Sequence, residues 1–245
     1  FKFCAPPPPL RTTHFALRIE HNYTKRNNIM AILSITCPQC HGTFPFTTYP
    51  AIDTKDDGRW VEKVRTGEAF LGKCPHCGWE THYDYSFLYK EREKNFLMYY
   101  AANEADYKSG YAMMTGHDPM VDWEKISSWT RRVVTSREDV LEKLMILDDG
   151  LDDRIIEILK ALAFVSLHQH KPELSVDTVL FDRGSDGNHY FRFSEKGNVV
   201  AAYAFERPMY ERVKRNLGEN LRHLTGGEVV INSQWAVKAL WAMQK

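Results

Sequence analysis

Four cysteines are the residues whose type and spacing point most directly to chemistry. They lie in two short motifs, Cys37-Pro38-Gln39-Cys40 and Cys74-Pro75-His76-Cys77, and two residues separate the thiols within each motif. A turn of this length lets both thiolates reach one ion, and two such turns supply the four soft ligands that a structural zinc prefers. The sequence therefore predicts one structural zinc ion bound by Cys37, Cys40, Cys74 and Cys77.

The residues that follow the two motifs differ. Gly78 comes directly after the second motif and suits the positive φ that this position often requires, whereas His41 and then Gly42 follow the first. This difference leaves His41 open as a substitute ligand, although the two intact CxxC motifs favour four thiolates. His76 lies inside its turn, and we expect its side chain to face solvent.

Redox or catalytic chemistry fits the setting of the paired motifs less well. A CxxC pair can exchange disulfides, but a redox motif is expected once, after a strand and at the start of a helix. This chain has two motifs, and strand-like sequence flanks both of them. A catalytic zinc keeps an open coordination position, which four cysteines would close. We therefore expect the ion to stabilise the fold rather than to catalyse a reaction.

The composition is that of a soluble globular protein. Of the 245 residues, 43% are hydrophobic and 26% are charged, and no apolar run approaches the roughly 20 residues of a membrane-spanning helix. Residues 1–29 hold five of the 32 basic and one of the 32 acidic residues, so residues 30–245 carry 27 basic and 31 acidic side chains, a net charge of −4. This charge is unusual for a protein that binds nucleic-acid phosphates. Four of the five cysteines lie in the paired motifs, which favours a reducing compartment, and we expect the cytoplasm.

Composition also divides the chain into segments. Residues 1–29 contain a run of four prolines and precede the first methionine, Met30, so we expect a disordered leader or upstream translated sequence there. We expect a zinc-ribbon-like antiparallel β domain over 30–104, a linker or docking segment over 105–136, and a C-terminal α+β domain over 137–245. The predicted fold class is therefore α+β.

Hydrophobic periodicity predicts the elements around the two motifs. They are strands over 31–36, 43–49 and 96–100, a helix over 54–66, and a longer strand with Tyr83, Tyr85, Phe87 and Tyr89 on one face. Residues 103–132 contain Gly110, Gly116 and Pro119 without a clear period, and we expect irregular structure there.

The second half has clearer helix signals. Ser136 predicts the start of one helix, Gly150 its end, and Asp152 the cap of the next. The elements expected after this pair are strands over 176–181, 190–193 and 199–205, a short helix opened by Pro208 and a last helix capped by Ser233. The C-terminal domain should therefore combine a helical pair with a small antiparallel sheet.

The chain resembles bacterial CpXC-domain proteins. The resemblance rests on the two CPxC motifs, on Phe87-Leu88-Tyr89 and on the later Leu147–Arg154 stretch, and it covers most of residues 30–165. It implies a zinc-ribbon-like domain that starts at Met30, and it implies no reaction, because the family is functionally uncharacterised. The 33 residues between the motifs exceed the spacer of about 15–20 in a compact ribbon, which fits an insert packed over it.

Other residue groups have both a functional and a structural interpretation. A row of aromatic residues could stack on single-stranded nucleic acid, but it is more typical of a sheet face inside a core. Four acidic residues around Gly150 could bind a divalent cation, but a turn and a helix N-terminus account for them more simply. The two groups are Tyr83, Tyr85, Phe87 and Tyr89, and Asp148, Asp149, Asp152 and Asp153.

Two further features favour structural roles. The Asp182–Asn188 stretch resembles a calcium loop but lacks the ligand period and terminal Glu of an EF-hand, so we expect a hairpin turn. His168 and His170 follow the end of a predicted helix, where they can meet free carbonyl groups.

The sequence leaves three functions open. The leading prediction is a non-enzymatic interaction module with a protein partner, in which zinc makes a β surface rigid. The first alternative is a nucleic-acid-binding protein that uses Lys125, Arg131, Arg132 and Arg137. The second is an enzyme whose active site lies in the C-terminal domain.

Overall fold

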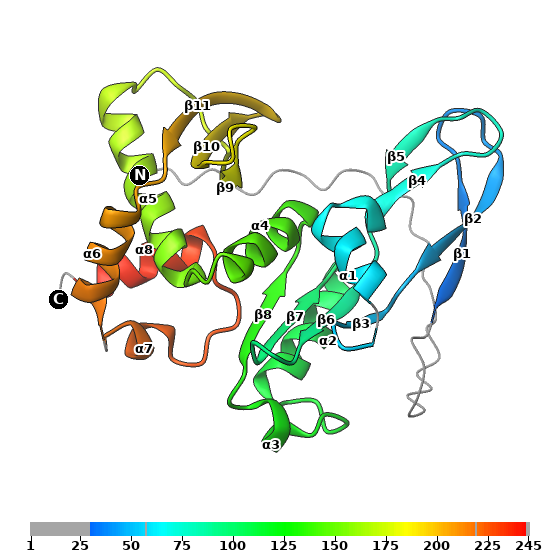
Figure 1. The fold of residues 1–245 in the computed structure, drawn as a ribbon, viewed down its shortest axis with the longest axis horizontal. Helices are drawn as coiled ribbons and strands as arrows, with labels where there is room; N and C mark the ends of the chain where they lie inside the picture. Colours follow the sequence, from blue (N-terminus) through cyan, green and yellow to red (C-terminus); the bar gives the residue numbers. More distant parts are fainter. Residues whose placement is uncertain (1–29, 57, 219, 244–245) are drawn as a thin grey trace.

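The described part of the chain contains both helices and small sheets. Figure 1 shows the computed structural model, which describes residues 30–56, 58–218 and 220–243. These residues form two two-stranded sheets, one three-stranded sheet and one four-stranded sheet, together with several helices, which confirms the α+β class. The expectation of a disordered leader over 1–29 lies outside the described residues.

Two β-hairpins carry the cysteine motifs. Strand β1 (Ala31–Thr36) pairs antiparallel with β2 (Thr43–Thr48), and β4 (Leu71–Lys73) pairs antiparallel with β5 (Glu80–His82). Each motif occupies the turn of its hairpin, and the two hairpins lie together at the right of Figure 1. The fold therefore brings together two turns that are far apart in the sequence.

A four-stranded mixed sheet lies beside the hairpins. Its order is β3 (Ala51–Asp53), β6 (Phe87–Glu91), β7 (Phe96–Tyr100) and β8 (Thr130–Val134). The central pair β6–β7 is antiparallel, whereas each edge strand runs parallel to its neighbour. The long aromatic strand predicted after the second motif is interrupted: β5 ends at His82 and β6 begins at Phe87.

The segment predicted to be irregular, 103–132, is largely regular. It contains α2 (Glu104–Thr115), α3 (Trp123–Ile126) and the start of β8, which completes the sheet. Asn103 caps α2 by accepting a hydrogen bond from the amide of Asp106. Gly110 lies within this helix, and the Tyr99 ring packs directly against it. A Cβ atom added to Gly110 would come within 2.2 Å of the Tyr99 Cδ1 atom, so only glycine leaves room for the ring. Gly110 suggested a helix break in the sequence, but in the structure it allows α2 to pack closely against the Tyr99 ring.

The helix predicted between the two cysteine motifs is present but shorter than predicted. Helix α1 spans Gly58–Arg65 rather than 54–66, and the short 3₁₀ helix η1 (Glu68–Phe70) follows it. Across the described part of the chain, no helix combines the length and apolarity needed to cross a bilayer.

The second half contains the predicted elements in their predicted order, together with one helix, α7, that was not predicted. Helix α4 (Arg137–Asp148) starts at Ser136, whose hydroxyl accepts from the Asp139 amide, and α5 (Asp153–His170) starts at Asp152, whose carboxylate accepts from the Arg154 amide. The later elements are β9 (Thr178–Arg183), β10 (His189–Glu195), β11 (Asn198–Ala204), α6 (Arg207–Leu217), α7 (Asn220–Thr225) and α8 (Ser233–Ala242). The three strands form an antiparallel sheet in the order β11-β10-β9. The predicted Ser233 cap is wrong, because the Asn232 side chain accepts from the Trp235 amide.

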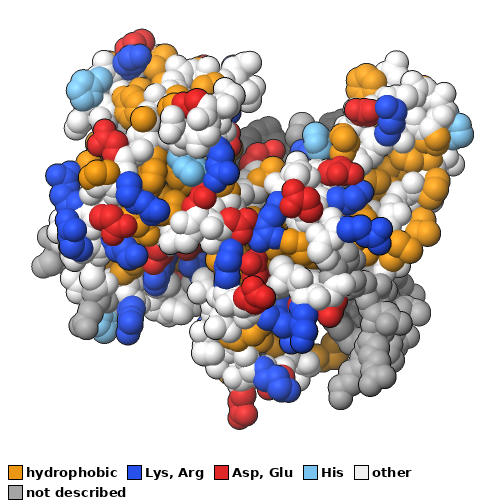
Figure 2. All heavy atoms as spheres, viewed as in Figure 1, with side chains coloured by type: hydrophobic (Ala, Val, Ile, Leu, Met, Phe, Trp, Pro, Cys, Tyr) orange, Lys and Arg blue, Asp and Glu red, His pale blue; other side chains and the backbone are white. Residues whose placement is uncertain are grey.

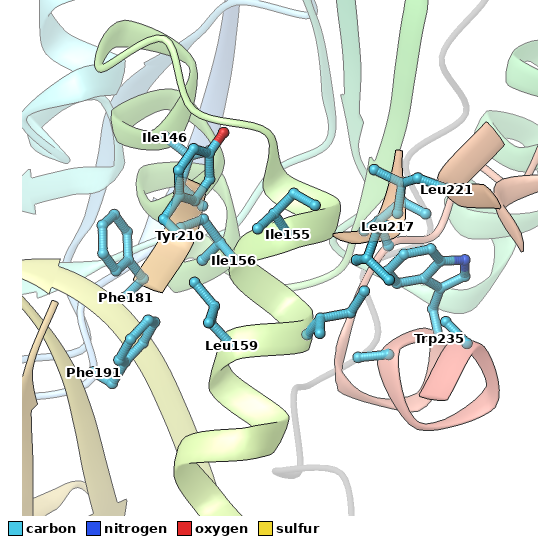
Figure 3. Close-up of a cluster of buried hydrophobic side chains, with 14 of the residues drawn as sticks. Ile146, Ile155, Ile156, Leu159, Phe181, Phe191, Tyr210, Leu217, Leu221 and Trp235 are labelled. Atoms are coloured by element: carbon cyan, nitrogen blue, oxygen red, sulfur yellow. The ribbon is translucent and has the colours of Figure 1, made fainter. Parts of the chain in front are cut away.

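Two large hydrophobic clusters hold these elements together. In the C-terminal cluster, Ile156 and Leu159 of α5 lie between Phe181 on one side and Trp235 on the other (Figure 3). The amino-terminal cluster combines the β1–β2 hairpin and the four-stranded sheet with Val140 and Leu144 of α4. Helix α4 thus belongs to the amino-terminal core as well, and the division of the chain at 136/137 stays a prediction.

Candidate metal centre

The four thiols meet at one point. Their sulfur atoms all lie within 4.8 Å of one another. The Cys37 and Cys77 sulfurs are 3.7 Å apart, and the Cys40 and Cys74 sulfurs are 3.6 Å apart. With Zn–S bonds of about 2.3 Å, sulfurs at the corners of a tetrahedron lie about 3.8 Å apart. The donor set therefore fits one tetrahedral ion, and these separations are too long for disulfide bonds.

The two turns have the same backbone geometry. The Cys37 amide donates to the Gly42 carbonyl at 2.9 Å, and the Cys74 amide donates to the Trp79 carbonyl at 2.8 Å. His41 has φ +58° and Gly78 has φ +75°, so each motif is followed by a residue in the left-handed region. Histidine is one of the residue types that enter this region more readily than most. His41 therefore shapes the first turn, and it is not among the clustered ligands.

His76 is exposed, as expected, and it also joins the two turns. Its Nε2 atom lies 3.2 Å from the Thr43 carbonyl oxygen. A Cβ atom added to Gly42 would come within 2.8 Å of the His76 Cδ2 atom. Gly42 thus leaves room for a ring from the other hairpin. The sequence contains no local signal for this contact, because 33 residues separate the two motifs.

One side of the centre is buried and the other is exposed. Cys37 and Cys74 are buried with Phe44, and Ile35 and Tyr83 pack against them. Cys40 and Cys77 are exposed. An ion held by the four thiols would therefore have two buried ligands, Cys37 and Cys74, and two exposed ligands, Cys40 and Cys77.

The clustered thiols perturb one another's ionisation. Burial opposes the ionisation of Cys37, but hydrogen bonds from the backbone amides of Cys40 and Gln39 outweigh it and lower the pKa of Cys37 to about 7. The Trp79 amide favours the thiolate of Cys77, yet partial desolvation of its sulfur together with the neighbouring thiols raises the pKa of Cys77 to about 12. A cation stabilises all the thiolates at once, because a coordinated thiol is deprotonated outright.

The aromatic row packs inside the protein. Tyr85, Phe87 and Tyr89 are buried, and Tyr83 is half-buried. The ring centroid of Phe70 lies 5.8 Å from that of Tyr85 and 6.0 Å from that of Phe87. These rings form core contacts, so they offer no surface for stacking bases.

The acidic residues around Gly150 pair with cations of the same chain. Asp148 accepts hydrogen bonds from Arg65 and Lys94, and Asp149 contacts Arg183 and His189. Asp152 pairs with Arg154 at 2.6 Å, and Asp153 pairs with Arg132 at 2.7 Å. Asp152 and Asp153 lie at the N-terminus of α5, as the structural interpretation predicts, whereas Asp148 and Asp149 lie at the end of α4, and each of the four carboxylates has a cationic partner.

Three of the four basic residues proposed for nucleic-acid binding also form ion pairs. Arg132 is buried against Asp153, Arg137 pairs with Asp84, and Lys125 pairs with Asp122. Arg131 instead lies over the Trp123 ring, 4.3 Å from its centroid. Figure 2 shows basic and acidic side chains interspersed over the visible face rather than gathered in a basic stripe.

The remaining predicted positions have local structural roles. Residues 184–188 connect β9 to β10, so the predicted hairpin turn is present but begins two residues later than predicted. The Asp186 carboxylate accepts from the Asn188 amide in this turn and from the Tyr190 hydroxyl of β10. His168 and His170 lie in the last turn of α5 rather than after it. The His168 ring stacks on Phe164, and the His170 Nδ1 atom lies 2.7 Å from the Ser166 carbonyl oxygen.

A buried ionic network was missed by sequence reasoning. Its six side chains come from β8, α4 and α5. They are Arg132, Glu142, Lys143, Asp153, Glu157 and Lys160. Half of the residues of α4 are charged, so the sequence gives no signal that tells the buried Glu142 and Lys143 from the exposed ones.

Two hairpins that converge on four thiols define a class of protein whose cysteines are close enough to hold one metal ion. A family model described as CpXC protein matches residues 35–160, which is just over half of the chain and includes both motifs. The chain belongs to this CpXC family. No curated protein and no solved structure shows a significant match to it.

Proposed function

We propose that this chain is a zinc-binding, non-enzymatic interaction module whose zinc-ribbon-like hairpins meet a protein partner. The observation that carries the proposal is the convergence of four thiols within 4.8 Å. A set of four sulfur ligands in tetrahedral arrangement suits zinc or iron. Zinc is the proposed ion because the site offers one tetrahedral position and two closed turns of the knuckle type.

The proposed role of the ion is structural. Four thiolates fill its coordination, which leaves no position for water or substrate. Hairpins of two strands are marginally stable on their own in water. Metal binding therefore contributes directly to the folding free energy of β1–β2 and β4–β5.

Exposed apolar side chains on the hairpins support a protein partner. Ile32 of β1 is 64% exposed, and Trp79, two residues after the second motif, is 47% exposed. Leu71 of β4 is also exposed. Apolar side chains of this size on a rigid surface are typical of interaction sites, and the inference from such hairpins to this role is an analogy. A reducing compartment, the cytoplasm, is part of the proposal because it keeps the thiols available to the metal.

The metal is tested by measuring it on the purified full chain. We expect one zinc per chain by elemental analysis and native mass spectrometry, and no visible absorption from iron. Cys74→Ser should lose the zinc, whereas the control Ser34→Ala, on β1 outside the centre, should keep it. Bound iron, or a wild-type chain that takes up no metal from zinc-supplemented medium, would refute the proposed centre.

The partner surface is tested with matched variants. Trp79→Ser should lose proteins that co-purify with the wild-type chain from its native cell, with its zinc content unchanged. Val199→Ser, which removes an equally exposed apolar residue from β11, should retain them. Equal retention by both variants, or retention that disappears with nuclease treatment, would count against a protein partner at the hairpins.

A further inference from the structure

Strand β1 has one edge that no described strand covers. It pairs only with β2, in a two-stranded sheet at the right of Figure 1. Among the described residues, no backbone hydrogen bond joins Ile32, Ser34 or Thr36 to a segment outside this hairpin. An uncovered edge of this kind can pair with a strand from another chain.

The register shows which backbone groups lie on this free edge. The Cys37 amide donates to the Gly42 carbonyl, so these two residues form a hydrogen-bonded pair. Hydrogen-bonded pairs alternate with non-hydrogen-bonded pairs along an antiparallel ladder. Ile32, Ser34 and Thr36 therefore fall in pairs of the second kind. Their amides and carbonyls point away from β2.

Pro45 of β2 agrees with this register and blunts the opposite edge of the hairpin. It lies opposite Ser34, in a non-hydrogen-bonded pair, where its missing N–H would point outward. The outer edge of β2 thus lacks one donor, which is a common protection against pairing. Strand β1 contains no proline, and its register with β2 has no shift. Only the edge of β1 therefore offers an uninterrupted series of donors and acceptors.

The hairpin β1–β2 also lacks protection by charge. Its strand sequences, AILSIT and TFPFTT, contain no charged side chain. In the second hairpin, by contrast, Lys73 of β4 pairs with Glu80 of β5 at 2.7 Å, and each strand has only three residues. Charged side chains and short strands are ordinary means to keep an edge from pairing. The two hairpins therefore differ, and β1 carries the edge that is open.

We propose that the protein partner adds an extended, uncharged segment to the free edge of β1, held by main-chain hydrogen bonds to Ile32, Ser34 and Thr36. This inference rests on the proposed interaction role and specifies the form of the partner. Successive side chains of a strand lie on opposite faces of its sheet. Exposed Ile32 would flank the added strand on one face, and half-buried Leu33 and Ile35 would flank it on the other. Apolar and β-branched side chains of the partner suit both faces.

The size of the edge favours an extended segment over a second folded copy. The six residues of β1 extend about 20 Å. A stable interface between two folded chains buries about 1,200–2,000 Å², far more than contact along one such edge supplies. An extended segment does not need this area, because hydrogen bonds hold its main chain along its length.

The test uses peptides selected on the zinc-loaded full chain from a random peptide library displayed on phage. The tightest peptide is synthesised together with two analogues, each N-methylated on one of the two alternating sets of amides. Because alternate amides of a strand point to opposite edges, one analogue should bind about tenfold or more weakly and the other should not. In the complex, NMR should show slower solvent exchange at the amides of Ile32, Ser34 and Thr36.

Substitutions locate the binding on β1. Ser34→Pro removes an outward amide without removing a hydrogen bond to β2, and Ile32→Lys adds a charge to the edge. Each should weaken the selected peptide by about tenfold. The controls Ser34→Ala, which keeps the amide, and Val199→Lys, which places the same charge on β11, should bind like the wild type. Zinc is measured in every variant, and Ile32→Lys decides the question if Ser34→Pro loses its zinc.

Three outcomes would overturn the pairing. They are a selection that yields no binding peptide, equal tolerance of both N-methylated analogues, and undiminished binding to Ile32→Lys and to any zinc-loaded Ser34→Pro. Binding that is insensitive to these β1 variants but lost in Trp79→Ser would also refute strand addition, while the proposed interaction role would stand. A molecular mass that doubles with concentration in the wild type but not in Ile32→Lys, without peptide binding, would assign the edge to a second copy instead.

Discussion

The ammonium group of Lys160 donates two hydrogen bonds to the Glu142 carboxylate, at 2.9 and 3.0 Å, with both side chains buried between α4 and α5. The same carboxylate accepts from the Phe181 amide at 2.6 Å, so the pair also connects the helices to β9. Lys160 further contacts Glu157 at 3.1 Å. The Glu142 carboxylate therefore depends on Lys160 as its hydrogen-bonded cation, whereas Lys160 has a second carboxylate in Glu157.

Removal of one partner should destabilise the protein more than removal of both. Lys160→Met leaves the Glu142 carboxylate buried without its cation and should lower the free energy of unfolding by about 3–5 kcal/mol. The double variant Glu142→Leu/Lys160→Met should recover part of this loss, because no uncompensated charge from the pair remains. Urea unfolding measures both, with Lys238→Met as an exposed control. Additive losses in the double variant would show that the pair is not coupled.

Acid should remove the stabilisation that Asp153 provides. Burial opposes the ionisation of Asp153, but Arg132 and Lys143 outweigh it and hold the pKa of Asp153 below its ordinary value. Because the unfolded chain takes up this proton near a pKa of about 3.9, the contribution is complete above about pH 5 and is lost as the pH falls further.

The variant Asp153→Asn isolates this contribution. It should be less stable than the wild type by about 3–5 kcal/mol near neutral pH, and the difference should shrink below about pH 4. Urea unfolding at a series of pH values measures the difference, and Glu173→Gln, an exposed control, should show none. A difference that stays constant down to about pH 2 would contradict the assigned ion pairs.

Contact between the two turns should make Gly42 sensitive to substitution. Gly42→Ala places a Cβ atom 2.8 Å from the His76 ring and should cost about 1–3 kcal/mol of stability through overpacking. His76→Ala in the same chain should relieve the strain, since it removes the ring. Thermal unfolding of the zinc-loaded single and double variants tests the coupling. No recovery in the double variant would mean that the ring is not the obstacle.

Gly110 should be equally sensitive for a different reason. Gly110→Ala would force the Tyr99 ring away from α2 and lower stability by about 1–3 kcal/mol, despite the better helix propensity of alanine. Gly58→Ala in α1 is the matched control, because nothing lies within 4 Å of its added Cβ atom. If Gly110→Ala were as stable as the wild type, α2 would not pack against β7 as described.

Loss of the metal should unfold the hairpins first. In Cys74→Ser, the amides of 31–48 and 71–82 should exchange with solvent far faster than in the wild type, because the two-stranded hairpins lose their cross-link. The amides of α5 should keep their protection, since the C-terminal cluster contains none of the cysteines. Hydrogen exchange with mass spectrometry resolves the two regions. A variant that exchanges like the wild type and retains zinc would contradict the structural role of the metal.

The sequence predicted best what is encoded locally. The two turns are specified by CxxC spacing, and the starts of α4 and α5 by Ser136 and Asp152, whose side chains cap amides two or three residues away. The predicted cap of the last helix, Ser233, was wrong by one residue, because Asn232 before it is also a residue type that serves this role.

What the sequence could not predict depends on distant contacts. The regular structure of 105–136 depends on Tyr99, which packs on Gly110, and on the pairing of β8 with β7. The burial of Glu142 and Lys160 could not be predicted for the same reason, since charged residues on a helix are ordinarily solvated. Tertiary packing decided each of these cases against local propensity.

The extent of α5 limits how this protein can be shortened. The family match ends at Lys160, in the middle of that helix, whereas Leu167 further along it is still part of the C-terminal cluster. A truncation after Lys160 would cut α5 in the middle. It would remove the C-terminal residues that pack on the remaining part of the helix and expose Ile156 and Leu159 to water. We therefore expect residues 35–160 of this chain not to fold without the residues that follow them.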